Sequence, residues 1–263
     1  MPLSNRIDFQ PQIPYREVER RTSKIIFLSC EGSVTEEGYF QIISELFSEA
    51  KAKIEIISVM QDIVQKVPKY RTEEEIKELS KNTPLQLVER IEKFKKDKEE
   101  KFDFKNHEDE FWIVADVDAH TKEEFIEDWK KALEKCDKQN YGYAISNPFF
   151  EIWLLLHHTD VREDDFAFAV TEEHPYEKTG HYRERLREQK APLQKEKKVK
   201  RKHYNIEKVK NAIERAKKLQ EEELKTCRDE FQKQELIRWP HALGTTVYKL
   251  LDEIVELQRQ MSL

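Results

Sequence analysis

Short apolar runs alternate with amphipathic segments over the first 160 residues of the chain. Four runs rich in Ile, Val and Phe predict buried β-strands at residues 24–30, 54–59, 111–118 and 141–145. Around them, apolar residues recur every three or four positions, which predicts helices over 33–47, 84–94, 121–133 and 149–157. Strands separated by helices of this length form parallel sheets with right-handed crossovers. The pattern therefore predicts an α/β fold with a mainly parallel four-stranded sheet flanked by helices.

Beyond residue 160 the composition changes to charged segments with helical periodicity. They predict helices over 181–190, 205–226 and 245–259, and the last two have one apolar face each. The start of the chain, in contrast, combines prolines and arginines without periodicity. We therefore divide the chain into an N-terminal arm at 1–22, an α/β core at 23–160, and a helical extension at 161–263 that packs on the core.

Acidic residues stand at the ends of two predicted strands. Asp116 and Asp118 close the third strand, and since side chains alternate along a strand, both point to one side, roughly 6 to 7 Å apart. Such a pair suits one Mg²⁺ or Mn²⁺ ion, which relieves the repulsion between the carboxylates. Glu31 directly follows the first strand, and parallel strands bring their carboxyl ends to one edge. These acids could instead cap helices or lie in solvated loops, but the three together favour a metal site.

Net charge and cysteine content narrow the class of protein. The 263 residues carry a formal net charge of -6, which repels nucleic acid unless a local basic patch or metal ions meet it. The three cysteines lack CxxC spacing, so they suggest neither a disulfide framework nor a zinc site. No apolar stretch approaches the roughly 20 residues that span a bilayer. We expect a cytoplasmic protein without a membrane partner.

One strongly basic run stands out in this acidic chain. It comprises Lys195, Lys197, Lys198, Lys200, Arg201 and Lys202. Charge runs are usually solvated surfaces, yet this one is a candidate contact for a nucleic-acid backbone. His181, Tyr182 and Tyr204 flank the run and could stack on single-stranded bases, although ordinary packing is the simpler explanation for each.

Several motifs resemble one known family. The segment IFLSCEGSVTE at 26–36, which also has the form of a helix capping box in its last four residues, is similar to the opening motif of the RloB-like proteins of the Toprim superfamily. The similarity continues in Asp116-Val117-Asp118, in SNPFFEIWLLLH at 146–157, and in TTVYKL at 245–250. It covers most of the chain from about residue 23 onwards, and the segment at 146–157 is its most specific part.

The resemblance implies a Toprim-like core in which a glutamate after the first strand and an Asp-x-Asp after the third hold Mg²⁺ for phosphoryl transfer. Carried over, Glu31 is the general acid/base or a metal ligand, and Asp116 and Asp118 are metal ligands. Glu151 completes a second metal position if its helix starts at the same edge. His157 is interpreted instead as a core histidine on the apolar side of that helix.

RloB-like proteins are also associated with antiphage defence, beside an ATPase of the AAA or ABC type. This sequence has no Gly-x-x-x-x-Gly-Lys-[Ser/Thr] loop, so ATP hydrolysis would belong to the partner. The resulting hypothesis is a Mg²⁺- or Mn²⁺-dependent endonuclease that hydrolyses RNA, including tRNA, or DNA under the control of that ATPase. RNA is preferred, because cleaving it lets a small toxin-like effector halt growth.

Two other functions stay open at this point. The chain could be a non-catalytic metal-binding module that docks the ATPase, or a nucleotidyl or phosphoryl transferase acting on a small nucleotide. The number of metal ions and the oligomeric state, including a homo-oligomer, also stay open.

Overall fold

A five-stranded sheet lies at the centre of the fold. The computed structural model describes residues 24–49, 54–59, 82–98, 104, 109–117, 123–170, 175–194 and 197–261. The strands are β1 (Lys24–Cys30), β2 (Ile54–Ser58), β3 (Glu110–Asp116), β4 (Gly142–Asn147) and β5 (Gly244–Thr245). Their order is β2-β1-β3-β4-β5, and the pairs among the first four strands are parallel. The predicted α/β class and the mainly parallel sheet are confirmed.

The predicted number of strands was one too low. β5 pairs antiparallel with β4, with Ser146 opposite Thr245. The sequence pattern had assigned residue 245 to a helix, which begins instead at Val247. The backbone N–H of Thr246 donates to the carbonyl of Ile145 over 2.7 Å and fixes this junction beside β4. A two-residue strand has no alternation to detect, which explains why periodicity missed it.

Nine helices occur in the described part of the chain. They are α1 (Thr35–Glu49), α4 (Pro84–Lys98), α5 (Glu123–Gln139), α6 (Glu151–Leu156), α7 (Glu163–Val170), α8 (Pro175–Glu188), α9 (Ile206–Thr226), α10 (Glu230–Arg238) and α11 (Val247–Met261). The seven predicted helices correspond to all of these except α7 and α10. α7 has 8 residues and α10 has 9, so each is too short to show a clear amphipathic pattern in the sequence.

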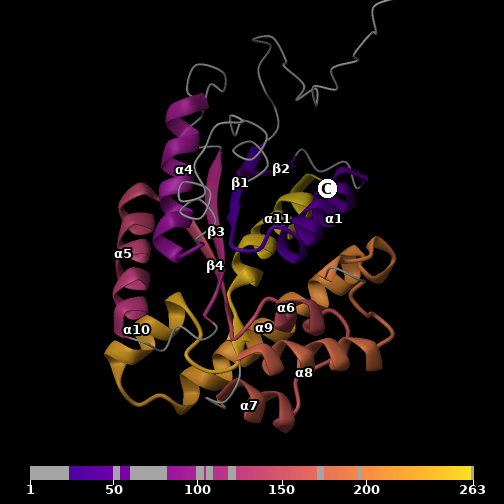
Figure 1. Ribbon diagram of the computed structural model, residues 1–263. Coiled ribbons are helices and arrows are strands. Elements are labelled where there is room, and N and C mark those ends of the chain that lie inside the picture. Colours follow the sequence, from indigo (N-terminus) through magenta and orange to yellow (C-terminus); the bar gives the residue numbers. More distant parts are fainter. Residues whose placement is uncertain are drawn as a thin grey trace, which may run out of the picture.

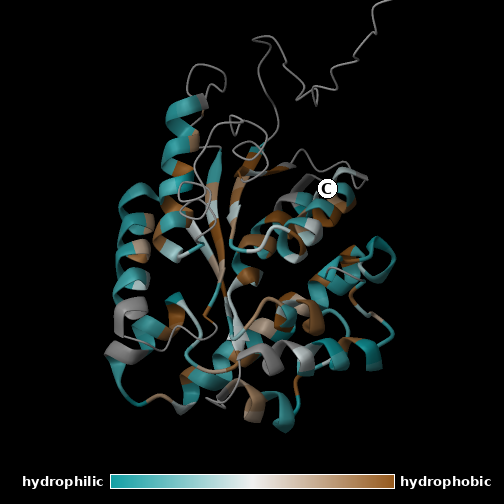
Figure 2. Cartoon of the chain, in the orientation of Figure 1, coloured by the Kyte–Doolittle hydropathy of each residue, from teal (hydrophilic) through white to brown (hydrophobic). Residues whose placement is uncertain are grey.

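Helices cover both faces of the sheet (Figure 1). α4 and α5 pack on one face, where Phe27, Phe111 and Ile113 form part of a buried cluster. Residues of α1, α6, α9 and α11 pack with Ile26 and Val114 on the other face. Both faces of β1 and β3 are therefore apolar, as expected for buried parallel strands. Figure 2 shows hydrophobic residues along these strands and hydrophilic residues over much of α4 and α5.

The segment after residue 160 shares its core with the strands. Val209 of α9 and Leu250 of α11 belong to the same buried cluster as Ile26 of β1. The division of the chain at residue 160 stays a prediction, as does the arm at 1–22, which lies outside the described residues. No helix in the described part of the chain has both the length and the apolar character needed to span a bilayer.

Candidate active site

The carboxyl ends of β1 and β3 meet at one edge of the sheet. Cys30 at the end of β1 lies opposite Val114, two residues before the end of β3. The backbone N–H of Glu31 donates to the carbonyl of Val114 over 2.9 Å. In turn, the backbone N–H of Asp116 donates to Oε2 of Glu31 over 2.9 Å. The structure therefore brings Glu31 and Asp116 together, as the parallel pairing of their strands led us to expect.

Asp116 is held in an environment that opposes its negative charge. The residue is half-buried, and its Oδ1 is shielded from solvent without a hydrogen-bond partner among the described residues. Burial raises the pKa of Asp116 well above its ordinary value, and the nearby charges of Glu36, Glu31 and Glu151 raise it further. A shielded carboxylate oxygen without a partner, close to other negative charges, is unfavourable in the folded protein. Binding of a cation or a proton at this oxygen would therefore stabilise the folded state.

Glu36 belongs to this group, although the sequence pattern presented it as a capping residue. It lies in the first turn of α1 and is only 8% exposed. Burial, followed by the charge of Glu151, raises its pKa from 4.5 to about 7. A Cβ atom at Gly32 would lie 2.1 Å from Oε2 of Glu36, so a side chain at position 32 would displace the Glu36 carboxylate from its place over the turn after β1.

Glu151 also reaches the group, which answers a question that the sequence left open. It is the first residue of α6 and 5% exposed. Its charge acts on both Asp116 and Glu36. Nε and Nη2 of Arg183, on α8, each donate to Oε1 of Glu151 over 3.3 Å. One oxygen of Glu151 is thus paired with a cation that the sequence gave no reason to expect there.

We call Glu31, Glu36, Asp116 and Glu151 the acidic group. Asp118, predicted as a metal ligand, lies outside the described residues, so its position relative to this group stays a prediction. Within the described residues, no three members of the acidic group have donor atoms all within 4.8 Å of one another; Asp164, Asp165 and His181 do.

In that second cluster, Asp165 is already paired with cationic side chains of the protein. Asp165 is fully buried, and Nε and Nη2 of Arg185 donate to its two oxygens over 3.0 and 3.1 Å. Nε2 of His181 lies 2.7 Å from Oδ1, and the backbone N–H of Arg162 donates to Oδ2 over 2.8 Å. These partners lower the pKa of Asp165 despite its burial. Because the guanidinium occupies both oxygens, we interpret this cluster as a buried ion pair that joins α7 to α8.

Part of the predicted basic run packs beside the acidic group. Lys197 and Lys198 are exposed, and Oγ1 of Thr35, at the start of α1, donates to the carbonyl of Lys197 over 3.2 Å. The charge of Lys197 lowers the pKa of Glu36 against the effect of burial. Lys200 and Arg201 are half-buried, Lys202 is exposed, and Lys195 lies outside the described residues.

The aromatic residues that flank the basic run do not offer free faces. Tyr182 is fully buried, and Tyr204 is 2% exposed. The ring of His181 stacks on Phe168 with centroids 3.9 Å apart. Ordinary packing is therefore the correct explanation for the two tyrosines, and base stacking on them is excluded in this conformation.

A different aromatic surface lies next to the ends of β3 and β4. A cavity of about 390 Å³ is lined by Val117 and Asn147 at these strand ends and by Trp129, Trp239 and His241. The rings of Trp239 and His241 lie 5.5 Å apart in an edge-to-face arrangement. Nothing in the sequence pattern linked residues 239–241 to the strand ends, because this proximity depends on the pairing of β5 with β4.

His157 is a core residue, as its position on the apolar side of the helix indicated. It is 2% exposed, and its Nδ1 donates to the carbonyl of Trp153 over 2.9 Å. Nε2 can then accept from the hydroxyl of Tyr39, 3.0 Å away. Burial lowers the pKa of His157 to about 3, so the imidazole is neutral at physiological pH.

Comparisons with known proteins identify one family. No curated protein and no solved structure matches the chain. The model of the family described as RloB-like protein matches residues 26–254. This match begins in β1 and ends in α11, so it includes every member of the acidic group. The chain therefore belongs to the RloB-like protein family.

Proposed function

We propose that this RloB-like chain is a Mg²⁺- or Mn²⁺-dependent endonuclease of the Toprim type that hydrolyses phosphodiester bonds in RNA, including tRNA, or in DNA. The observation that carries the proposal is the acidic group, in which Asp116 presents a buried oxygen without a partner. Carboxylate oxygens are the ligands that Mg²⁺ and Mn²⁺ prefer, so the donor set fits such a cation.

Each residue has a distinct proposed role. Glu31 and Asp116 would hold the cation together with Asp118, and Glu151 would complete a second metal position. A bound divalent cation supplies charge neutralisation on the phosphate oxygens and lowers the pKa of water. Glu36 has a pKa of about 7, which suits a group that takes up or releases a proton near neutral pH.

The substrate would meet cations and aromatic rings on its way to the acidic group. Exposed Lys197 and Lys198 lie beside α1 and would neutralise backbone phosphates of a strand. Lys200, Arg201 and Lys202 continue this basic surface. Trp239 and His241, in the cavity at the ends of β3 and β4, would stack on bases. This arrangement supports single-stranded segments as substrates, since stacked bases must be accessible.

Regulation by a partner ATPase and a role in antiphage defence are part of the same proposal. They rest on membership of the RloB-like family. An effector that cleaves cellular RNA has to be kept inactive until infection, and an ATPase that binds this chain would provide that control.

The decisive experiment is a cleavage assay with the full chain. Labelled tRNA, single-stranded DNA and duplex DNA are incubated with the protein and Mg²⁺ or Mn²⁺, alone and with the ATPase and ATP. Asp116→Asn removes the central carboxylate and should abolish cleavage. Asp164→Asn is the matched control, because it changes the same chemistry in the cluster filled by Arg185 and should leave cleavage unchanged. Loss of activity in Asp164→Asn alone would indicate that the metal binds at Asp164, Asp165 and His181 instead.

A non-catalytic module is the alternative that one observation favours, namely the pairing of Glu151 with Arg183. A module of this kind would bind Mg²⁺ and the ATPase without turnover. The same assay separates the two functions, because the absence of cleavage under every condition, with ATPase binding retained, contradicts the endonuclease.

A further inference from the structure

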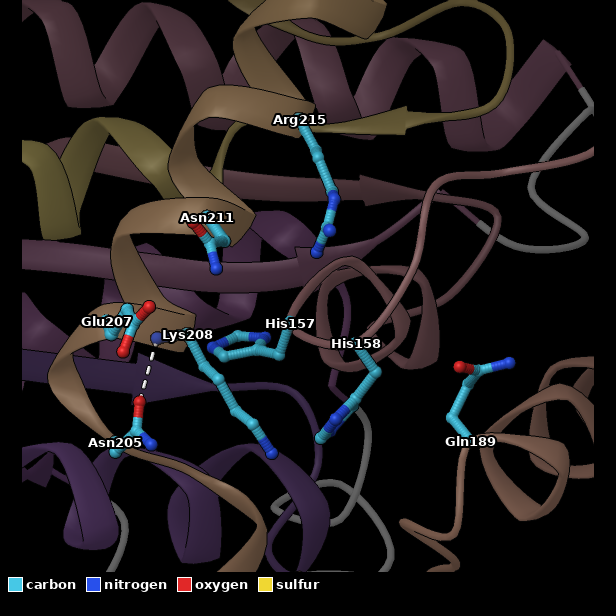
Figure 3. Close-up of a pocket in the computed structure, with 8 residues that line it drawn as sticks. All are labelled: His157, His158, Gln189, Asn205, Glu207, Lys208, Asn211 and Arg215. Atoms are coloured by element: carbon cyan, nitrogen blue, oxygen red, sulfur yellow. Dashed lines mark hydrogen bonds between the residues drawn. The ribbon is translucent and has the colours of Figure 1, made fainter.

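A second polar cavity lies at the far end of α6 from Glu151. It has a volume of about 400 Å³, within the range of small-molecule sites. It is formed where the end of α6, the end of α8 and the first half of α9 meet (Figure 3). Its lining residues are His157, His158, Gln189, Asn205, Glu207, Lys208, Asn211 and Arg215.

Two cationic residues of α9 line this cavity, and each has hydrogen-bond donors that no described residue uses. The ammonium group of Lys208 donates to the carbonyl of His203 over 2.9 Å, which uses one of its three donors. Nη1 of Arg215 donates to the carbonyl of Leu156 over 2.7 Å, and its Nε lies 3.3 Å from the exposed carboxylate of Asp160. The remaining guanidinium donors are available to a ligand. Figure 3 shows Arg215 extending toward His157, and Lys208 beside His158.

The cavity also holds neutral polar atoms that have no partner within the described residues. Nε2 of His158 is buried without a hydrogen-bond partner in the described part of the chain. Burial, and then the charges of Lys208, His203 and Arg215, lower the pKa of His158 to about 4, so its ring is neutral at physiological pH. The side-chain amide of Asn205 accepts from the backbone N–H of Lys208, so its NH₂ group stays free to donate.

These observations point to an anionic ligand with further polar groups. A phosphate accepts several hydrogen bonds from an ammonium, a guanidinium and an imidazole at once. The amides of Asn205 and Asn211 suit the edge of a base or the hydroxyls of a sugar, and the volume suits one nucleotide. The two cations Lys208 and Arg215 outnumber Glu207 among the lining residues, and Asp160, which lies outside the lining, pairs with Nε of Arg215.

We propose that this cavity binds the phosphate group of a single nucleotide, either as a free nucleoside monophosphate or as the 5′-phosphorylated end of a nucleic-acid strand. The inference does not depend on the proposed endonuclease, because none of the lining residues belongs to the acidic group. It assigns to this chain a nucleotide-binding site at the junction of α6, α8 and α9.

Binding measurements in EDTA test the site without cleavage. Calorimetry with each of the four ribonucleoside 5′-monophosphates, against the matching nucleosides, examines the free nucleotide. Fluorescence anisotropy with a 5′-phosphorylated decanucleotide, against its 5′-hydroxyl form, examines the strand end. For at least one pair we expect the phosphorylated form to bind more tightly by tenfold or more, and the pair that shows the preference identifies the source.

Single substitutions then test whether the ligand binds in this cavity. Lys208→Gln should lower the affinity for the phosphorylated ligand by about tenfold, or 1.4 kcal/mol. Lys210→Gln makes the same change at an exposed position of α9 outside the cavity and should have no effect. Asn211→Leu narrows the cavity without removing a charge and should also weaken binding. Asp116→Asn should retain full affinity, which separates this site from the acidic group.

The proposal is overturned if neither phosphorylated ligand is preferred over its unphosphorylated form. It is equally overturned if Lys208→Gln and Asn211→Leu, both shown to be folded by their thermal transitions, bind the preferred ligand as the wild type does.

Discussion

Replacing Glu36 by Gln tests how much the burial of its carboxylate, together with repulsion by Glu151, destabilises the folded protein. In the folded protein the pKa of Glu36 is raised from 4.5 to about 7. The folded state therefore binds this proton more tightly than the unfolded state, so wild-type stability decreases as the pH rises from 4.5 to 7. At 1.36 kcal/mol per pH unit, the contribution at pH 8 is a destabilisation of about 3 kcal/mol. Glu36→Gln keeps the shape of the side chain and removes this penalty.

The assay is urea unfolding and thermal melting in EDTA at pH 5 and at pH 8. At pH 8 the variant should be more stable than the wild type by about 3 kcal/mol, or about 5 °C in Tm for a chain of this size. At pH 5 the difference should shrink to about 1 kcal/mol or less, because Glu36 is then neutral in the folded state and only partly ionised in the unfolded state. Glu45→Gln, on the exposed side of the same helix, is the control and should change neither value. A Glu36→Gln protein that is less stable than the wild type at pH 8 would refute the argument.

Other predictions examine the remaining charges. In EDTA-treated protein, Mg²⁺ should raise the Tm of the wild type but not of Asp116→Asn; equal shifts would contradict the metal site. Asp165→Asn breaks a buried ion pair and should cost about 3 to 5 kcal/mol in urea unfolding, whereas a loss under 1 kcal/mol would contradict the pairing. The pKa of His157 is lowered to about 3, so the stability of the wild type relative to His157→Gln should fall by about 3 kcal/mol between pH 6.5 and 4; an unchanged difference between the two proteins would contradict a neutral, buried His157. Lys197→Gln/Lys198→Gln should weaken nucleic-acid binding and reduce its salt slope by roughly 1 per lost phosphate contact; an unchanged slope would contradict that surface.

The main elements of the fold could be predicted because their signals are local. Strands β1 to β4 are apolar runs, and α9 and α11 carry one continuous apolar face. What escaped prediction depends on contacts between distant parts of the chain. β5 is defined only by its pairing with β4, nearly a hundred residues earlier. Short helices such as α7 are defined by ion pairs like that between Asp165 and Arg185 rather than by periodicity.

The acidic group shows the same limit at the level of single residues. Glu31 and Asp116 could be placed together because parallel strands fix where their ends lie. Glu36 was missed because the capping-box pattern already explained an acid at that position. Its inward direction depends on the space above Gly32, which no periodicity encodes. The pairing of Arg183 with Glu151 joins residues from α8 and α6 and could not be inferred from either segment alone.

The cations near the acidic group come from a different part of the chain than the acids. The four acids all come from residues before 160, whereas Arg183 and Lys197 both come from residues after it. These two cations partly offset the repulsion that the acids create. The same C-terminal segment supplies Val209 and Leu250 to the core on one face of the sheet. A fragment that ended at residue 160 would therefore lose part of the apolar cover on one face of β1 and β3, together with the cations that offset the repulsion within the acidic group. The segment after 160 is thus part of the candidate active site, whose charge balance depends on residues from both sides of position 160.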